Sequence, residues 1–188
     1  MNNHSPSKIG IRTRAAIATL TISALGFTTW MTSEGFSPTP YIPTKNDVPT
    51  IGHGSTRYED GTRVKLSDPP ITKQRAEVLA RNLMSGDEKS FRATIPNVSL
   101  YQTEYDLYLD FVGQYGIGNW RSSSMRRHLL KGEYEQSCKS LLKWRRAGGY
   151  DCSTMINGKP NNRCWGVWVR QLERYDKCIR AQAYGDDE

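Results

Sequence analysis

The feature that most constrains this chain is a charge-free stretch near its start. Residues 15–33 read AAIATLTISALGFTTWMTS, and the three charges that precede them, Lys8, Arg12 and Arg14, are all basic. Nineteen helical residues would span roughly 28 Å, just enough for the hydrocarbon core of a bilayer. Glu34 follows at once. Because an ordinary surface charge seldom borders an apolar segment, Glu34 indicates chemistry tied to a membrane-crossing segment.

The stretch is nevertheless a weak membrane anchor, because seven of its nineteen residues are Ser or Thr and much of the rest is Ala or Gly. Four interpretations are open. They are a cleaved signal peptide with a site at Ser23-Ala24-Leu25-Gly26, a permanent anchor, a marginal anchor that inserts and later leaves the bilayer, and a buried helix of a globular fold. The marginal anchor fits both the length and the low hydrophobicity, so it is our prediction. The basic flank predicts a cytoplasmic N-terminus.

The rest of the chain is long enough for one domain with a substantial core and too short for two. We therefore predict a signal-anchor segment, residues 1–33, followed by a single folded domain, residues 34–188. The formal net charge is +7, of which three charges belong to the leader. Such a charge suits an anionic polymer such as a cell wall. Nucleic acid is not an expected partner, because no basic run interleaved with aromatic residues and no zinc finger or RNA-binding motif is present.

All four cysteines, Cys138, Cys152, Cys164 and Cys178, lie in the last third of the chain. An even number in an exported chain predicts two disulfides and an oxidising compartment. Three pairings are possible. We predict that Cys138 pairs with Cys178, because both lie on expected helices. The other two would then close a polar loop that has little apolar surface to bury. No metal site is expected, because the chain has no CxxC motif and no His after His128.

Short β-prone pieces separated by turn formers precede a series of helical patterns. Residues 41–66 predict a hairpin or a three-stranded sheet, and Thr72 is a suitable N-cap for the first helix. The expected helices cover residues 72–84, 102–115, 122–131 and 133–145, and a last helix carries an apolar stripe of Trp168, Leu172, Tyr175 and Ile179. We expect the aromatic stripes to form core. Strands followed by helices predict an α+β fold.

Two carboxylates are candidates for catalysis. A partly desolvated acid such as Glu34 has a raised pKa and can donate a proton near neutral pH. Cleavage of a glycosidic bond needs such an acid and a second group that activates water or stabilises positive charge. Asp47, three residues before Thr50, is available for that role. Each carboxylate also has a simpler interpretation, a charge at a helix end for Glu34 and a turn residue for Asp47.

Several motifs, taken in order, resemble those of the phage-type lysozymes, glycoside hydrolase family 24. They are Glu34-Gly35-Phe36, Pro40-Tyr41, Thr50-Ile51-Gly52-His53-Gly54-Ser55-Thr56, Gly116-Ile117-Gly118-Asn119-Trp120, Leu129-Leu130-Lys131-Gly132, Trp144 with Arg145-Arg146-Ala147-Gly148-Gly149, and Val167-Trp168-Val169-Arg170-Gln171-Leu172-Glu173. The resemblance spans residues 34–178 and implies a lysozyme-like α+β fold, a small β-hairpin or three-stranded sheet before a mainly helical domain. With the N-terminal transmembrane-like helix, the chain resembles the signal-arrest-release endolysins, which are held inactive on the host inner membrane and freed when it is depolarised.

The resemblance implies a catalytic triad of Glu, Asp and Thr. Glu34 and Thr50 match its outer members. The family spacing would place the middle member at Pro43 or Thr44, so this chain departs from the pattern. The nearest acid is Asp47. We predict Asp47 as the second catalytic carboxylate, because residues a few positions apart at a hairpin tip lie close together in space.

By the same resemblance, the chain is expected to be an endolysin that hydrolyses β-1,4 bonds between N-acetylmuramic acid and N-acetylglucosamine, with no metal or other cofactor. An inverting reaction would need two carboxyls roughly 6.5–9.5 Å apart. For substrate binding we expect Gly52 and Gly54 to allow close backbone approach. His53 would bind substrate or brace the strand.

The expected partners are peptidoglycan and, through residues 15–33, the host inner membrane, with a monomer after release. The expected location is the inner membrane facing the periplasm, and then the periplasm itself. Two alternatives of different kinds remain. A lytic transglycosylase uses one Glu and leaves 1,6-anhydro ends, although the motif at Thr50 argues against it. A non-catalytic wall-binding module on a membrane tether would still bind the wall without Glu34.

Overall fold

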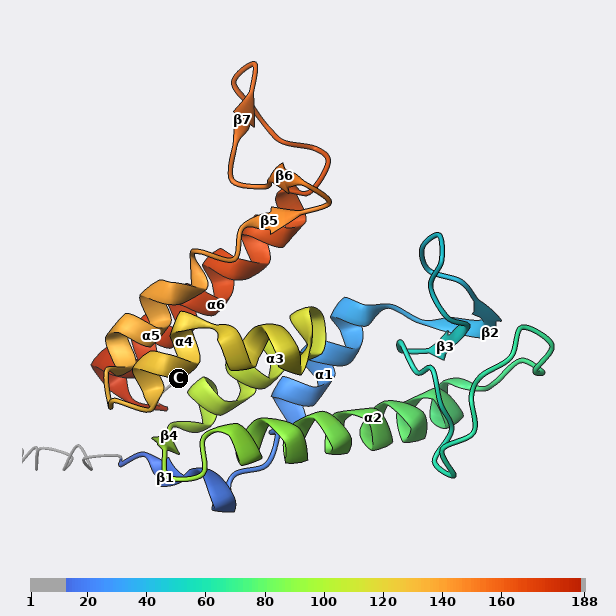
Figure 1. Cartoon of the computed structure of the whole chain (residues 1–188), viewed down its shortest axis with the longest axis horizontal. Coiled ribbons are helices and arrows are strands. Elements are labelled where there is room, and N and C mark those ends of the chain that lie inside the picture. The colour runs from blue at the N-terminus through green and yellow to red at the C-terminus, as the bar shows by residue number, and fades with distance from the viewer. Residues whose placement is uncertain (1–12, 187–188) are drawn as a thin grey trace, which may run out of the picture.

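The computed structural model describes residues 13–186, and helices form most of it (Figure 1). The helices are α1 (Ala24–Glu34), α2 (Lys73–Thr94), α3 (Gln102–Ser122), α4 (Ser124–Leu129), α5 (Tyr134–Leu141) and α6 (Trp165–Tyr184), with a turn of 3-10 helix at Ile17–Thr19. The strands form four antiparallel pairs: β1 (Ala15–Ala16) with β4 (Ser99–Leu100), β2 (Ser37–Tyr41) with β3 (Thr50–Gly52), β5 (Arg146–Ala147) with β6 (Tyr150–Asp151), and β7 (Met155–Ile156) with β8 (Lys159–Pro160). This is the predicted α+β class, with a two-stranded hairpin in the β-prone region.

The single transmembrane-like helix expected over residues 15–33 is not formed in this structure. The segment is instead divided into strand β1, the 3-10 turn and helix α1. The division falls before Ser23, whose hydroxyl accepts a hydrogen bond from the Gly26 N–H and so caps α1. The Ser23 hydroxyl also donates to Asp106 on α3. Within the described range, no helix combines the length and hydrophobicity needed to cross a bilayer.

The N-terminal segment packs into the core of the domain. Ile17, Leu20, Phe27 and Trp30 are each at most 7% exposed. Trp30 approaches α3 at Gly113, where a Cβ atom would lie 2.4 Å from the indole Nε1. Any larger residue there would push the two helices apart. Most of the large apolar side chains that suggested a membrane anchor are therefore core residues in this structure, whereas Leu25 is 74% exposed.

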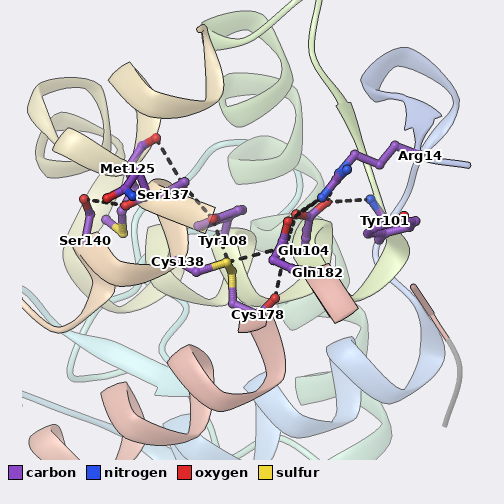
Figure 2. Close-up of a disulfide and its surroundings, with 11 residues drawn as sticks. Arg14, Tyr101, Glu104, Tyr108, Met125, Ser137, Cys138, Ser140, Cys178 and Gln182 are labelled. Carbon is purple, nitrogen blue, oxygen red and sulfur yellow. Dashed lines mark hydrogen bonds and ion pairs between the residues drawn. A yellow bond between two sulfur atoms is a disulfide. The ribbon is translucent and has the colours of Figure 1, made fainter. Parts of the chain in front are cut away.

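A buried ion pair fixes the start of this segment (Figure 2). Glu104 on α3 is fully buried, and Arg14 pairs with both of its oxygens, at 2.9 Å through Nε and 3.1 Å through Nη2. Gln182 on α6 bonds to both partners. The guanidinium group also lies over the rings of Tyr101 and Tyr134. Because a buried carboxylate without a partner is costly, Arg14 ties the N-terminal segment to α3 and α6.

Both predicted disulfides are confirmed. Cys138 on α5 is bonded to Cys178 on α6, and both are fully buried beside the Arg14 cluster (Figure 2). Cys152 is bonded to Cys164 and closes the loop between β6 and the start of α6. One disulfide therefore joins two helices of the core, and the other closes the polar loop that was expected to need it.

The predicted helix start at Thr72 is confirmed, since its hydroxyl accepts a hydrogen bond from the Arg75 N–H at 3.1 Å. Helix α2 runs well past the expected end at Met84, to Thr94. Helix α3 buries the predicted stripe completely, and a non-helical Gly116 (φ 81°) kinks it just after the expected end of that helix. Sequence periodicity thus located the faces of these helices better than their ends.

Helix α6 presents only part of the predicted face to the core: Cys178 beside the predicted stripe is buried, and Ile179 packs against the core. Its buried residues are Gln171, Arg174, Cys178 and Ala181, whereas Leu172 of the predicted stripe is 39% exposed. The disulfide at Cys178 and the ion pair of Arg174 with Asp110 on α3 fix this face. A covalent bond and a buried charge pair therefore outweigh the apolar pattern in setting the rotation of the helix.

Candidate active site

Glu34 is the last residue of α1, at the point where the helical body meets the β2–β3 hairpin. Gly35 ends the helix with a φ of 74°, a conformation that favours glycine, and its N–H bonds to the Thr32 carbonyl. The chain then turns directly into β2. Glu34 thus stands on a rigid element, at its boundary with the hairpin.

Two glycines of the hairpin region make close approaches to different partners. Gly54 has a φ of +91°, and a Cβ atom there would lie 3.8 Å from Oε2 of Glu34. Gly52 has a φ of +66° and is buried against α2, where a Cβ atom would lie 3.1 Å from that of Ala76. The backbone at Gly54 therefore borders the acid, while Gly52 lets β3 pack on α2.

His53 lies between these glycines, and its ring packs at a tilt against Phe36, with ring centroids 5.5 Å apart. This contact connects β3 to the start of β2, which agrees with the bracing role considered from sequence. Within the described residues, His53 Nδ1 is buried without a hydrogen-bond partner. A pocket of about 340 Å³ adjoins the ring and is lined by Met31, Phe36, His53, Lys73, Gln74 and Glu77.

A cluster of charges lies on the helical side of Glu34. Asp110 on α3 pairs with Arg170 at 2.5 Å and with Arg174 at 2.5 Å, both from α6. Arg174 is held further by Gln171, which in turn bonds to the Tyr115 hydroxyl. The cluster fixes α6 against α3 and places two guanidinium groups near the acid.

The environment of Glu34 has opposing effects on its pKa. Burial is the largest influence and raises the pKa above its usual range. The positive charge of Arg170 lowers it, the Asp110 carboxylate raises it, and Arg174 and His53 add smaller lowering effects. The net direction is upward. A carboxyl group with a raised pKa holds its proton at higher pH, as a general acid requires.

Thr50 and Asp47 lie on the hairpin side. Thr50 is buried at the start of β3, and its hydroxyl donates to the Val48 carbonyl at 3.1 Å. Asp47 is exposed in the loop before β3 and accepts hydrogen bonds from the Thr44 hydroxyl at 3.2 Å and the Val48 N–H at 2.9 Å. Its carboxylate therefore caps its own turn. Neither of these bonds reaches Glu34 or Thr50.

The charge cluster of Asp110, Arg170 and Arg174 was not predicted from the sequence as part of a site. Two signals were available. Asp110 lies between the apolar residues Leu109 and Phe111 of the expected helix 102–115, and Arg170 lies inside a motif that supports the family resemblance. Residues 13–186 contain no group of three or more His, Cys, Asp and Glu side chains that could hold a metal ion.

The similarity of this chain to known proteins shows a glycoside hydrolase of lysozyme type. The family model of phage lysozymes matches residues 31–162, and the chain belongs to that family. It is 28% identical over 127 residues to the endolysin of Salmonella phage P22, covering 68% of this chain and 85% of that relative. It is 26% identical over 141 residues to the SAR-endolysin of Enterobacteria phage PA-2, covering 74% and 82%.

The lysozyme-like fold predicted from the sequence is confirmed by comparison with solved structures. The crystal structure of a mutant of P22 lysozyme matches with a TM-score of 0.67 at 23% sequence identity. The match covers 85% of this chain and 99% of that one. The helical body and the small hairpin therefore belong to one known architecture.

We expect Arg170→Gln to move the alkaline limb of kcat/KM to higher pH. Removing a nearby positive charge raises the pKa of Glu34 further, and a general acid is active only while protonated. The measurement is a pH–rate profile on purified cell walls. Arg180→Gln, on the exposed face of the same helix, serves as the control and should leave the profile unchanged. A limb that stays in place or moves to lower pH would contradict this electrostatic coupling.

Proposed function

We propose that this chain is an endolysin that hydrolyses the β-1,4 bonds between N-acetylmuramic acid and N-acetylglucosamine in peptidoglycan and so lyses the host cell. Membership of the phage lysozyme family and the matches to endolysins support this activity. The observation that carries the proposal is Glu34, half-buried at the end of α1 with a raised pKa and bordered by the backbone at Gly54.

In this mechanism, Glu34 donates its proton to the oxygen of the leaving sugar. Burial raises the pKa of the carboxyl group and so favours its protonated form, while Arg170 and Arg174 stabilise the carboxylate that forms once the proton has left. The two arginines are already paired with Asp110, so the charge near the acid is held in a fixed position. Glu34, Asp110 and the two arginines all lie on helices, and His53 after β3 adds a smaller effect.

Asp47 and Thr50 are the proposed groups on the other side of the bond. Asp47 is the only acid in the loop between β2 and β3, and Thr50 stands at the base of that loop. Together they would orient the attacking water or support the positive charge of the transition state. For this role, the Asp47 carboxylate must exchange its turn hydrogen bonds for substrate or water.

The hydrogen bonds of Asp47 also favour one alternative. A reaction that uses a single catalytic Glu needs no second carboxylate, so Asp47 would serve only its own turn. That reaction is the one catalysed by a lytic transglycosylase. The two reactions differ in their products, since hydrolysis leaves reducing ends and transglycosylation leaves 1,6-anhydro ends.

We expect Glu34→Gln to reduce wall cleavage by a factor of at least about 100 without unfolding the domain, because the amide cannot donate the proton that the leaving oxygen needs. Digests of purified wall analysed for reducing and anhydro ends provide the measurement. Glu135→Gln, an exposed substitution of the same type on α5, is the control. Residual activity above about a tenth of wild type would remove Glu34 from the mechanism. Anhydro ends would identify a transglycosylase.

The role of Asp47 can be separated from the role of its turn. If the carboxylate acts on water, Asp47→Asn should lower kcat roughly tenfold or more, whereas Thr44→Val should have little effect. Thr44→Val removes the hydroxyl that bonds to Asp47 but keeps the carboxylate. Initial rates on purified walls decide between the two roles. Equal losses in the two variants, or none in either, would show that Asp47 only shapes the turn.

We propose further that residues 1–33 are a signal anchor that holds the chain on the host inner membrane, and that the domain acts in the periplasm after release. Two matches to proteins named SAR-endolysins support this proposal. The docked segment also argues for release without cleavage. A cut near Ala24 would remove Ile17 and Leu20 from the core and would leave Glu104 without Arg14.

Release can be tested at positions that the docked structure leaves exposed. Thr21, Thr28 and Thr29 face solvent, so replacing all three with Leu strengthens the anchor with little effect on the docked fold. Each added Leu should stabilise the membrane-inserted form by roughly 1–3 kcal/mol. We expect this variant to remain in the membrane fraction and to delay lysis, while a triple Thr→Ser control is released normally. Lysis at wild-type timing by the Leu variant would disprove the anchor.

A further inference from the structure

Residues 145–164 form an excursion between α5 and α6 that we call the basic arm. It consists of the β5–β6 and β7–β8 hairpins, with the Cys152–Cys164 disulfide at its base. Figure 1 shows the arm extending away from the helical body at the N-terminal end of α6. The arm joins the N-terminal end of α6, the helix whose Arg170 lies near enough to Glu34 to lower its pKa. The base of the arm is therefore close in the chain to a residue that lies near the acid.

Polar contacts, rather than a core, give the arm its shape. Asn161 is 3% exposed, and its amide donates to the Asp151 carbonyl and the Thr154 hydroxyl, while its side-chain oxygen accepts the Arg163 N–H. Asp151 in turn accepts two hydrogen bonds from Ser153. With the disulfide, these bonds hold the arm in one conformation before any partner arrives. A preorganised surface loses little entropy on binding.

The arm presents apolar and basic groups outward. Tyr150, Met155 and Ile156 are 45–56% exposed, so they contribute little to stability where they stand. Four cations, Arg145, Arg146, Lys159 and Arg163, share the arm with a single acid, Asp151.

Most of this positive charge is uncompensated. Arg145 pairs with Asp151, and Arg163 lies over the Tyr150 ring. In the described part of the chain, Lys159 and Arg163 have no carboxylate within ion-pair distance, and Arg146 interacts with Asp151 only at longer range than Arg145 does. Exposed cations beside exposed apolar groups form a surface suited to an anionic peptide.

We propose that the basic arm binds the free carboxylates of the peptide stems that the peptidoglycan glycan carries. The proposal rests on the hydrolase function above and names the part of the substrate that the arm recognises. The sugars of the glycan are uncharged where the stems are attached, whereas the stems carry free carboxylates. Charge complementarity therefore selects the stem over the sugar. Arg170, which lies near Glu34, is only a few residues beyond the arm on α6, so a strand cleaved at Glu34 brings stems to the arm.

The test compares Lys159→Glu/Arg163→Glu with Lys89→Glu/Lys177→Glu. The control residues are exposed on α2 and α6, outside the arm, and their replacement changes the net charge equally. Each full-length protein is assayed for release of reducing ends from native walls and from walls whose free carboxylates have been converted to methylamides. On native walls, the arm variant should raise KM about three- to tenfold at similar kcat, because exposed ion pairs are individually weak. On amidated walls, the arm variant should match wild type.

Other outcomes would overturn the proposal. An equal loss on native and amidated walls would mean that the arm contacts sugar or only supports the fold. A similar loss for the control pair would mean that net charge alone matters. A variant with unchanged KM that no longer binds phosphatidylglycerol vesicles would make the arm a membrane surface. If wild type releases no reducing ends from either substrate, the failure lies with the hydrolase function and not with the arm.

Discussion

The docking of residues 14–34 onto α3 is the interaction on which the rest of this structure depends. It buries Phe27 and Trp30, pairs Arg14 with the fully buried Glu104, and ends at Glu34. The acid is therefore positioned by the same helix that completes the core. Since stability of a domain is a small difference between large terms, one segment that supplies both packing and a buried ion pair affects the whole fold.

The composition of this segment suits two environments. Its hydroxyls bond to carbonyls of their own helix, as in Thr28 to Ala24 and Thr32 to Thr28, both at 2.8 Å. A hydroxyl satisfied in this way costs little in an apolar surrounding, and the same bonds are available in a continuous helix. In the docked state, these Thr residues face solvent. A Ser- and Thr-rich segment is thus able to lie either within a bilayer or in contact with water. A Leu-rich segment would strongly favour the bilayer.

Local signals in the sequence predicted local features of the structure. The Thr72 cap, the buried face of α3 and the two disulfides follow from capping, periodicity and cysteine placement. The break before Ser23 was not predictable in this way, because it depends on Asp106, which lies more than 80 residues away. The rotation of α6 likewise depends on Asp110, another distant partner of opposite charge. Periodicity reports hydrophobic burial and carries no information on buried charge pairs.

The candidate site was likewise predictable only in part, because some of its features depend on distant residues. Glu34 and Thr50 were selected from motifs of adjacent residues, but the charges with the largest effects on the pKa of Glu34 come from α3 and α6. The family spacing gave no acid at the middle position, and the structure shows Asp47 bonded within its own turn. The hairpin contributes backbone at Gly54 close to the acid. Prediction of such a site needs the positions of three elements that are far apart in the chain.

The two parts of the candidate site belong to different packing units, and under the signal-anchor proposal this links catalysis to the state of the leader. Thr50 and Asp47 are held by the β2–β3 hairpin, whose second strand packs on α2 through Gly52 and Ala76. Glu34 is held by α1, whose place is set by Trp30 against Gly113 on α3. Only Gly35 and Phe36 lie between α1 and β2. With the leader in a bilayer, the hairpin could still fold, but the acid would lack its position beside Arg170 and Asp110. Under the signal-anchor proposal, docking of the leader and assembly of the active site are therefore one event.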